Sequence, residues 1–227
     1  MDLSSPKDVL EGLSFEVRKC SLCALSQTRK NAVAGEGPKS AEIMFIGEAP
    51  GRREDSLGKP FIGCAGRILD AALSKAGIKR SEVFITNVVK CRPPYNRRPK
   101  IKERLACMPY LERQILAVSP KIICILGSTA YRSLLGGKSI IADRGKIVEK
   151  DGKRFFLTVH PASAIYNKSL LSDLENDILN LAGEIRQRGH MNKKTRRHDQ
   201  ALALEGKSTQ INPIIENQLS LNKDIPI

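Results

Sequence analysis

The 227-residue chain has no tryptophan, and aromatic residues make up only 4% of it, so a phenylalanine or tyrosine in a loop stands out. No apolar run approaches the roughly 18 residues that a membrane span needs. The first ten residues lack the basic start and apolar core of a signal peptide. We therefore expect a cytoplasmic protein, kept in a reducing compartment, with no membrane partner.

Acidic residues are outnumbered, since 38 Lys and Arg against 24 Asp and Glu give a net charge of +14. The basic residues are clustered: residues 90–104 carry seven positive charges and one negative, and residues 188–207 carry six and two. Clustered positive charge favours a polyanionic partner such as nucleic acid over mere solubility. No basic amphipathic helix with a large apolar face is evident, which argues against a membrane surface.

Cysteines are too few for a disulfide-dense scaffold, but four of the six have the spacing of a metal site: Cys20, Cys23, Cys91 and Cys107. The first two form a CxxC pair, and fifteen residues separate the last two. Thiolates suit both zinc and iron–sulfur clusters. Zinc usually takes two short, similar pairs, so the spread second pair favours a cluster, with zinc as the alternative. Cys124, in an apolar run, is expected in the core, and Cys64 has no evident partner.

Apolar segments alternate with helical patterns along the chain. The sequence predicts strands at residues 41–47, 83–89, 121–126 and 155–159, and helices at residues 63–76, 101–118, 129–135 and 169–188. Strands that are apolar throughout indicate a mostly parallel sheet with helices on both faces, an α/β three-layer sandwich. Ligands of such folds bind at the carboxyl ends of the strands, where residues 47–55, 87–92 and 160–164 follow.

Short motifs occupy these strand ends: GEAPG at 47–51 with Glu54-Asp55, GKPFIG at 58–63, TNVVKCRPP at 86–94 and HPA at 160–162. Their order and spacing, with the four cysteines, resemble the family 4 uracil-DNA glycosylases, the iron–sulfur type, over residues 20–188. The Glu54-Asp55 pair and the complete cysteine set favour family 4 over its nearest relatives. The resemblance implies the uracil-DNA glycosylase fold and a 4Fe-4S cluster on the four cysteines.

The resemblance also implies a function: a prokaryotic DNA repair enzyme, expected to be a monomer, that hydrolyses the N-glycosidic bond of uracil in single- or double-stranded DNA. The motifs hold no lysine evident as a Schiff-base nucleophile, so we expect an abasic product without strand cleavage. The alternative is a non-catalytic iron–sulfur module of the same fold that binds nucleic acid. The intact set of Glu48, Phe61, Asn87 and His160 disfavours that alternative.

Three residues are predicted to handle the extruded base. Phe61 would stack on it, unless the ring is only a buried loop anchor. The Asn87 amide can pair with both the N3 donor and the O4 acceptor of uracil and would mismatch cytosine at both, unless it is only a turn-forming cap. His160 would donate to uracil O2 and stabilise the leaving anion.

The origin of the attacking water stays open in the sequence. In family 1 relatives an aspartate that orients this water occupies the position of Ala49, and alanine cannot do this. Glu48 could place the water, the backbone of Glu48 and Ala49 could contact the base, or uracil departure could need no strong base. A family 1 tyrosine that blocks the thymine methyl matches Gly51, and Glu54 is the predicted substitute.

Two segments are predicted to touch DNA. Arg97, Arg98 and Lys100 would lie on phosphates, unless they form a solvated loop. The loop after His160-Pro161 resembles the element that enters the minor groove, with Ile165 or Tyr166 as the wedge.

The chain turns polar after residue 188 and loses any amphipathic period, so we predict a domain over residues 1–188 and a flexible, basic and polar tail over residues 189–227. Near its end stands a segment like the peptide that docks on bacterial sliding clamps, although the final aromatic is missing: Gln218, Leu219, Ser220 and Leu221. A sliding clamp is thus a candidate partner. Chance occurrence in a polar tail is the alternative.

Overall fold

The computed structural model describes the backbone of residues 6–205. The chain divides into two units, residues 1–182 and residues 183–227. Within the described range, every helix is too short or too polar to cross a bilayer.

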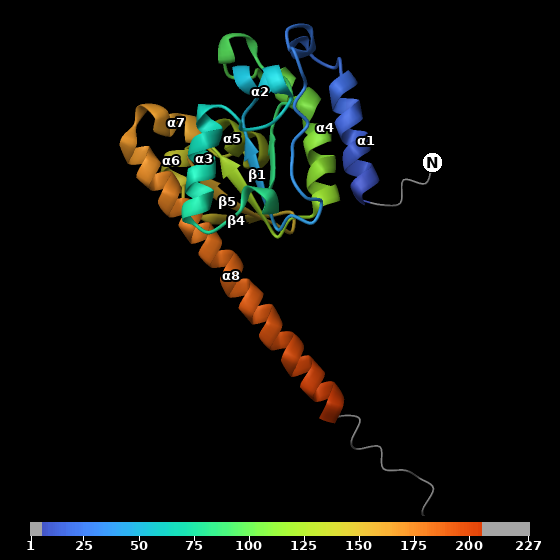
Figure 1. Ribbon diagram of the computed structural model, residues 1–227, viewed down its shortest axis with the longest axis vertical. Coiled ribbons are helices and arrows are strands. Elements are labelled where there is room, and N and C mark those ends of the chain that lie inside the picture. The colour runs from blue at the N-terminus through green and yellow to red at the C-terminus, as the bar shows by residue number, and fades with distance from the viewer. Residues whose placement is uncertain (1–5, 206–227) are drawn as a thin grey trace, which may run out of the picture. The chain divides into compact units, whose positions relative to one another are not determined.

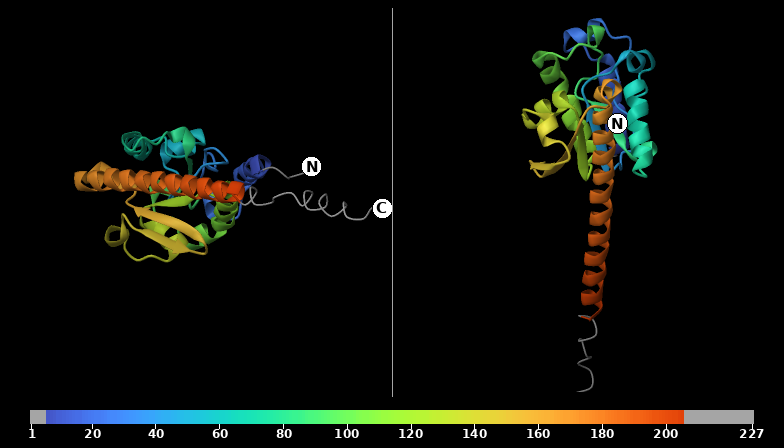
Figure 2. Two further views of the ribbon diagram at one scale, coloured as in Figure 1. Left: turned by 90° about the horizontal axis from the view of Figure 1, so that it is seen from below. Right: turned by 90° about the vertical axis from the view of Figure 1, so that its left-hand side faces the viewer.

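The first unit is built on a five-stranded sheet of order β2-β1-β3-β5-β4. The strands are β1 (Ile43–Gly47), β2 (Phe84–Asn87), β3 (Ile122–Leu126), β4 (Ile147–Lys150) and β5 (Lys153–Thr158). Four strands run parallel, and β4 pairs antiparallel with β5 at one edge. Every residue of β1, β2 and β3 is buried, because helices cover both faces of the sheet (Figures 1 and 2). The predicted α/β sandwich is confirmed.

The helices are α1 (Pro6–Lys19), α2 (Arg52–Leu57), α3 (Cys64–Lys75), α4 (Ile101–Val118), α5 (Ser128–Leu135), α6 (Ile140–Asp143), α7 (Pro161–Tyr166) and α8 (Lys168–Glu205). In the first unit α1 packs on α4, and α3 packs on α7. Helix α3 buries Leu69, Ala72 and Leu73, which share one face at the predicted spacing. Short 3-10 turns lie at 24–27, 80–82 and 94–96.

Two predicted elements differ from the structure. The loop after His160-Pro161 is the short helix α7. Helix α8 continues to Glu205 instead of ending at Arg188, so the predicted flexible tail begins with helical backbone. Residues 189–205 include two each of Lys, Arg, Ala and Leu, which are good helix formers even without an apolar face. The clamp-like segment at residues 218–221 lies outside the described residues.

Candidate active site

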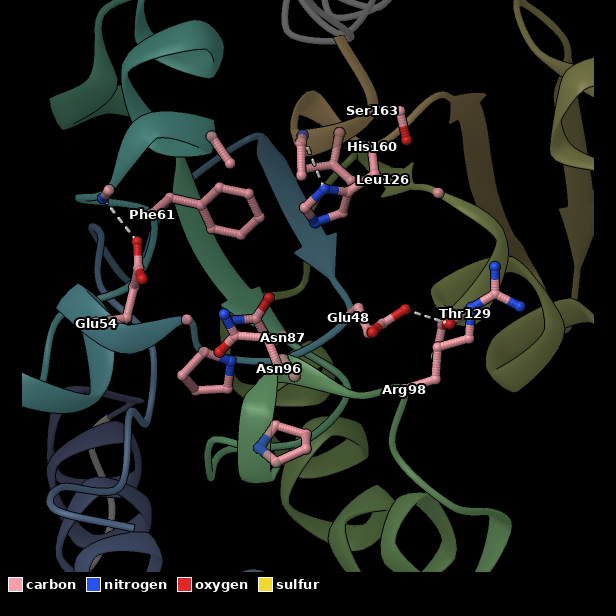
Figure 3. A pocket seen from close by; sticks show the side chains of 18 of the residues that line it. Glu48, Glu54, Phe61, Asn87, Asn96, Arg98, Leu126, Thr129, His160 and Ser163 are labelled. Atoms are coloured by element: carbon pink, nitrogen blue, oxygen red, sulfur yellow. Dashed lines mark hydrogen bonds between the residues drawn. The ribbon is translucent and has the colours of Figure 1, made fainter. Parts of the chain in front are cut away.

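A cavity of about 640 Å³ opens where the strands β1, β2, β3 and β5 end (Figure 3). The three predicted strand-end segments meet there. Its walls include the predicted site residues Glu48, Ala49, Glu54, Phe61, Asn87 and His160. Parallel strands bring their carboxyl ends to one edge, which explains why residues more than a hundred positions apart share one pocket.

Asn87 is the last residue of β2 and is 1% exposed. Its side-chain oxygen Oδ1 is buried and has no hydrogen-bond partner among the described residues. A Cβ atom on Gly47 would lie 2.5 Å from both this oxygen and Cζ of Phe61, so only glycine leaves the two groups room. A buried acceptor without a partner is costly, so Asn87 Oδ1 is a candidate acceptor for a donor from a ligand.

His160 faces Phe61 across the cavity, with 5.7 Å between the ring centroids and 32° between the ring planes. Its Nδ1 accepts a hydrogen bond of 3.1 Å from the backbone N–H of Ala162, so the proton of the neutral ring sits on Nε2. Burial lowers the pKa of His160 to about 4, and the nearby Glu54 charge offsets this only in part. At neutral pH the ring is therefore uncharged and offers one donor, Nε2–H, to the cavity.

Glu54 fastens the loop that carries Phe61. Its Oε1 accepts from the backbone N–H groups of Ile62, at 2.9 Å, and Gly63, at 2.7 Å. Its Oε2 occupies the space beside Gly51, where a Cβ atom would lie only 2.8 Å away. Glu54 thus fills the volume that a side chain at position 51 would need, as a substitute barrier requires.

Glu48 is held by a residue that the sequence did not single out. The hydroxyl of Thr129, in the first turn of α5, donates to the Glu48 carboxylate (Figure 3). The end of β3 and the start of α5 also line the cavity. The Gly127-Ser128-Thr129 segment follows a buried parallel strand, and that position could have revealed it. Ala49 brings no ionisable group to the wall.

Two of the five predicted DNA-contacting residues line the cavity, and the other three do not. Arg97 and Arg98 line it, but the Arg97 guanidinium makes a two-point ion pair with Glu103, at 2.6 and 2.9 Å. Lys100 is exposed at the start of α4. The predicted wedge residues stand at the end of α7, where Ile165 is 44% and Tyr166 is 91% exposed.

The four predicted cluster cysteines line one small second pocket: Cys20, Cys23, Cys91 and Cys107. They come from the segment after α1, the segment after β2, and α4. Burial raises the pKa of Cys91 and raises that of Cys107 to about 11. Arg29 donates to Cys91 Sγ at 3.0 Å. Within the described residues, no group of three or more His, Cys, Asp or Glu side chains could hold a metal ion as placed. Cys124 is buried in β3, as predicted.

Lys90 joins this second pocket to the first. Its backbone N–H donates to Cys107 Sγ at 3.3 Å, and its ammonium group donates to the backbone oxygen of Asn87 at 2.8 Å. The same ammonium donates to Thr86 and Gln114, both at 2.6 Å. Burial lowers the pKa of Lys90 to about 8. The sequence counted Lys90 within a basic, DNA-facing stretch, whereas the structure buries it.

Comparisons with known proteins identify the family of this chain. The profile of the Uracil DNA glycosylase superfamily matches residues 34–181. A type-4 uracil-DNA glycosylase of Saccharolobus solfataricus is 49% identical over 180 residues, which cover 75% of this chain and 83% of the relative. The chain belongs to the type-4 uracil-DNA glycosylases. Another type-4 uracil-DNA glycosylase, from Thermotoga maritima, is 41% identical over 178 residues (74% of this chain, 93% of the relative).

The type-4 assignment is more specific than the superfamily. A type-5 uracil-DNA glycosylase of Pyrobaculum aerophilum is similar at a lower level, 28% identity over 154 residues, which cover 60% of this chain and 68% of the relative. In the present chain, the match to the superfamily profile includes Glu48, Asn87 and His160. It begins at residue 34, after Cys20 and Cys23.

Proposed function

We propose that this chain excises uracil from DNA by hydrolysing the N-glycosidic bond, and that it leaves an abasic site without cutting the strand. The unpaired, buried Oδ1 of Asn87 carries the proposal. Uracil offers an N–H donor at N3 to this acceptor and a carbonyl at O4 to the amide N–H₂. Cytosine presents a lone pair at N3 and a donor at its amino group, so it opposes Asn87 at both positions.

Phe61 would hold the base, and His160 would stabilise the charge that develops on it. Phe61 is 5% exposed and forms a flat wall beside the cavity, as stacking on an extruded base requires. The Nε2–H of neutral His160 would donate to uracil O2 as negative charge develops there. A preorganised donor that needs no rearrangement is effective in such a site.

Glu48 would position the attacking water. Its carboxylate is fixed by the Thr129 hydroxyl and lies in the cavity wall on the side away from Phe61 (Figure 3). Ala49 cannot serve, because its methyl group has no atom that accepts a hydrogen bond or a proton from water. Glu54 would exclude thymine, since it fills the space beside Gly51 and is locked by two backbone donors.

The residues of the second pocket fit a 4Fe-4S cluster. Such a cluster takes four thiolates, and four cysteines line this one pocket. The Arg29 and Lys90 side chains place positive charge beside the thiols. When bound, the cluster would cross-link the segment after α1, the segment after β2 and helix α4, and it would take no part in the reaction.

The partner of the enzyme would be uracil-containing DNA, single- or double-stranded. Arg98 and Lys100 are exposed and would contact phosphates. Ile165 and Tyr166 are exposed and would form the minor-groove wedge. A sliding clamp bound through residues 218–221, a monomeric state and a cytoplasmic location stay predictions from the sequence.

The test is incubation of the purified protein with oligonucleotides that contain one uracil, followed by alkali to cut abasic sites. We expect cleavage only after alkali. Strand cleavage before alkali would contradict the monofunctional assignment. DNA binding without any uracil release would favour the non-catalytic alternative.

A further inference from the structure

Tyr95 is the most exposed large apolar side chain among the described residues, with 97% of its surface open to solvent. It lies in the turn between β2 and α4, and its φ angle is 55°. Asn96, the next residue, also has φ 55°. Side chains other than glycine adopt this left-handed conformation at a cost, and such positions cluster at functional sites. An aromatic side chain on a strained backbone is thus exposed to solvent.

The turn that presents Tyr95 is rigid. Two prolines precede the ring at positions 93 and 94. Asn96 is fixed on both sides: its backbone N–H donates to the Pro93 oxygen at 3.0 Å, and its side-chain oxygen accepts from Arg92 at 2.8 Å. The ion pair between Arg97 and Glu103 then ties the turn to α4. These contacts hold the backbone of the turn that carries Tyr95.

The surroundings of Tyr95 point to a ligand that is both flat and anionic. Its neighbours Pro93, Asn96 and Arg98 line the active-site cavity, and Figure 3 shows Asn96 and Arg98 on the rim nearest Asn87 and Glu48. Arg98 and Lys100 are exposed close by in the chain. An exposed aromatic ring whose chain neighbours line a pocket, with two exposed cations within five residues, matches the platforms on which bases of single-stranded nucleic acid stack.

We propose that Tyr95 is a stacking platform for a nucleobase of the bound DNA strand, next to the nucleotide that enters the cavity. The proposal rests on the proposed function, because it takes DNA as the substrate. It adds a base-binding subsite outside the cavity, distinct from Phe61 within it and from Tyr166 on α7. Stacking is tolerant of sequence, since every base has a flat face, so this subsite would add affinity without choosing a flanking base.

Tyr95→Gly separates a binding role from a structural one. Glycine adopts positive φ without strain, so the midpoint of thermal unfolding should stay the same or rise. Binding to a uracil-free single strand with an abasic-site analogue, measured by fluorescence anisotropy, should weaken about tenfold, which equals about 1.4 kcal/mol. Tyr95→Phe keeps the ring and should bind within about twofold of wild type. Phe15→Ala, on the exposed aromatic of α1, should leave affinity unchanged.

The absence of tryptophan from the chain allows a direct readout of stacking. Tyr95→Trp installs a single indole, and its emission should be quenched when the same strand binds. Phe15→Trp should show no quenching. Unquenched emission from Tyr95→Trp at saturating DNA, or equal affinity of wild type and Tyr95→Gly, would overturn the proposal. Quenching in a protein that releases no uracil would instead overturn the proposed function and leave the stacking subsite standing.

Discussion

Replacement of His160 by alanine should slow uracil excision strongly. The ring offers one donor only, because Nδ1 is engaged by the Ala162 N–H, so alanine removes the whole contribution. Loss of one preorganised donor of this kind costs roughly 10²–10³ in rate, or about 3–4 kcal/mol. His160→Gln can place an N–H near the same point, so it should recover about a tenth or more of the loss in the logarithm of the excision rate. The stability of each variant is measured as a control, because a smaller side chain leaves a cavity beside Phe61.

The assay is single-turnover excision at saturating enzyme, so that DNA binding does not limit the observed rate. A His160→Ala rate within about twofold of wild type would refute the role of this donor. The pH profile gives an independent check. Because the pKa of His160 is lowered to about 4, the wild-type rate should show no inflection near 6.5 from this ring. An inflection there that disappears in His160→Ala would show that the charged ring takes part.

Three further predictions concern base reading, the thiol pocket and acid stability. Asn87→Asp should reduce uracil excision about tenfold or more, because a carboxylate cannot donate to O4, and it should admit weak cytosine excision; unchanged uracil kinetics would leave Asn87 a structural cap. Protein purified without oxygen should be brown with iron bound, and Cys91→Ser should bleach it while Cys64→Ser should not; stoichiometric zinc without iron would contradict the cluster. Because the pKa of His160 is lowered to about 4, this ring binds a proton more readily in the unfolded chain than in the folded one. The free energy of unfolding should therefore be highest above pH 6.5 and should fall between pH 6.5 and about pH 4. The loss in the free energy of unfolding is at most about 3 kcal/mol, because part of the ring faces the cavity. Denaturant unfolding of wild type and His160→Ala at pH 6.5 and at about pH 4 measures this loss. An equal pH dependence of the two proteins would contradict the assignment.

Strand ends were predictable because parallel strands give long buried apolar runs. Asn87 and His160 each follow such a run, so both fall at the same edge of the sheet. The short edge strand β4 was not predicted, since its half-exposed residues make neither an apolar run nor a clear alternation. The helix α8 was predicted too short because its second half has good helix formers but no apolar face.

Charge states and partners could not be predicted, because they depend on tertiary burial. The neutral state of His160 follows from the cavity around it, which no local pattern encodes. Lys90 and Arg97 both count as positive charge in the sequence. The structure buries the first against Asn87 and pairs the second with Glu103, which leaves less free charge for DNA than the composition suggests. The hydrogen bond between Thr129 and Glu48 joins the segment after β1 to the first turn of α5, so the sequence could indicate only that both residues follow buried strands.

The central claim is that the unpaired Asn87 carbonyl reads the N3–H of uracil. The most direct measurement compares three oligonucleotides that differ in one base: uracil, N3-methyluracil and cytosine. Single-turnover excision by the wild-type protein is followed by alkali cleavage. We expect abasic sites from the uracil strand alone, because the other two bases lack a donor at N3. Similar release of uracil and N3-methyluracil, or no release of uracil at all, would contradict it.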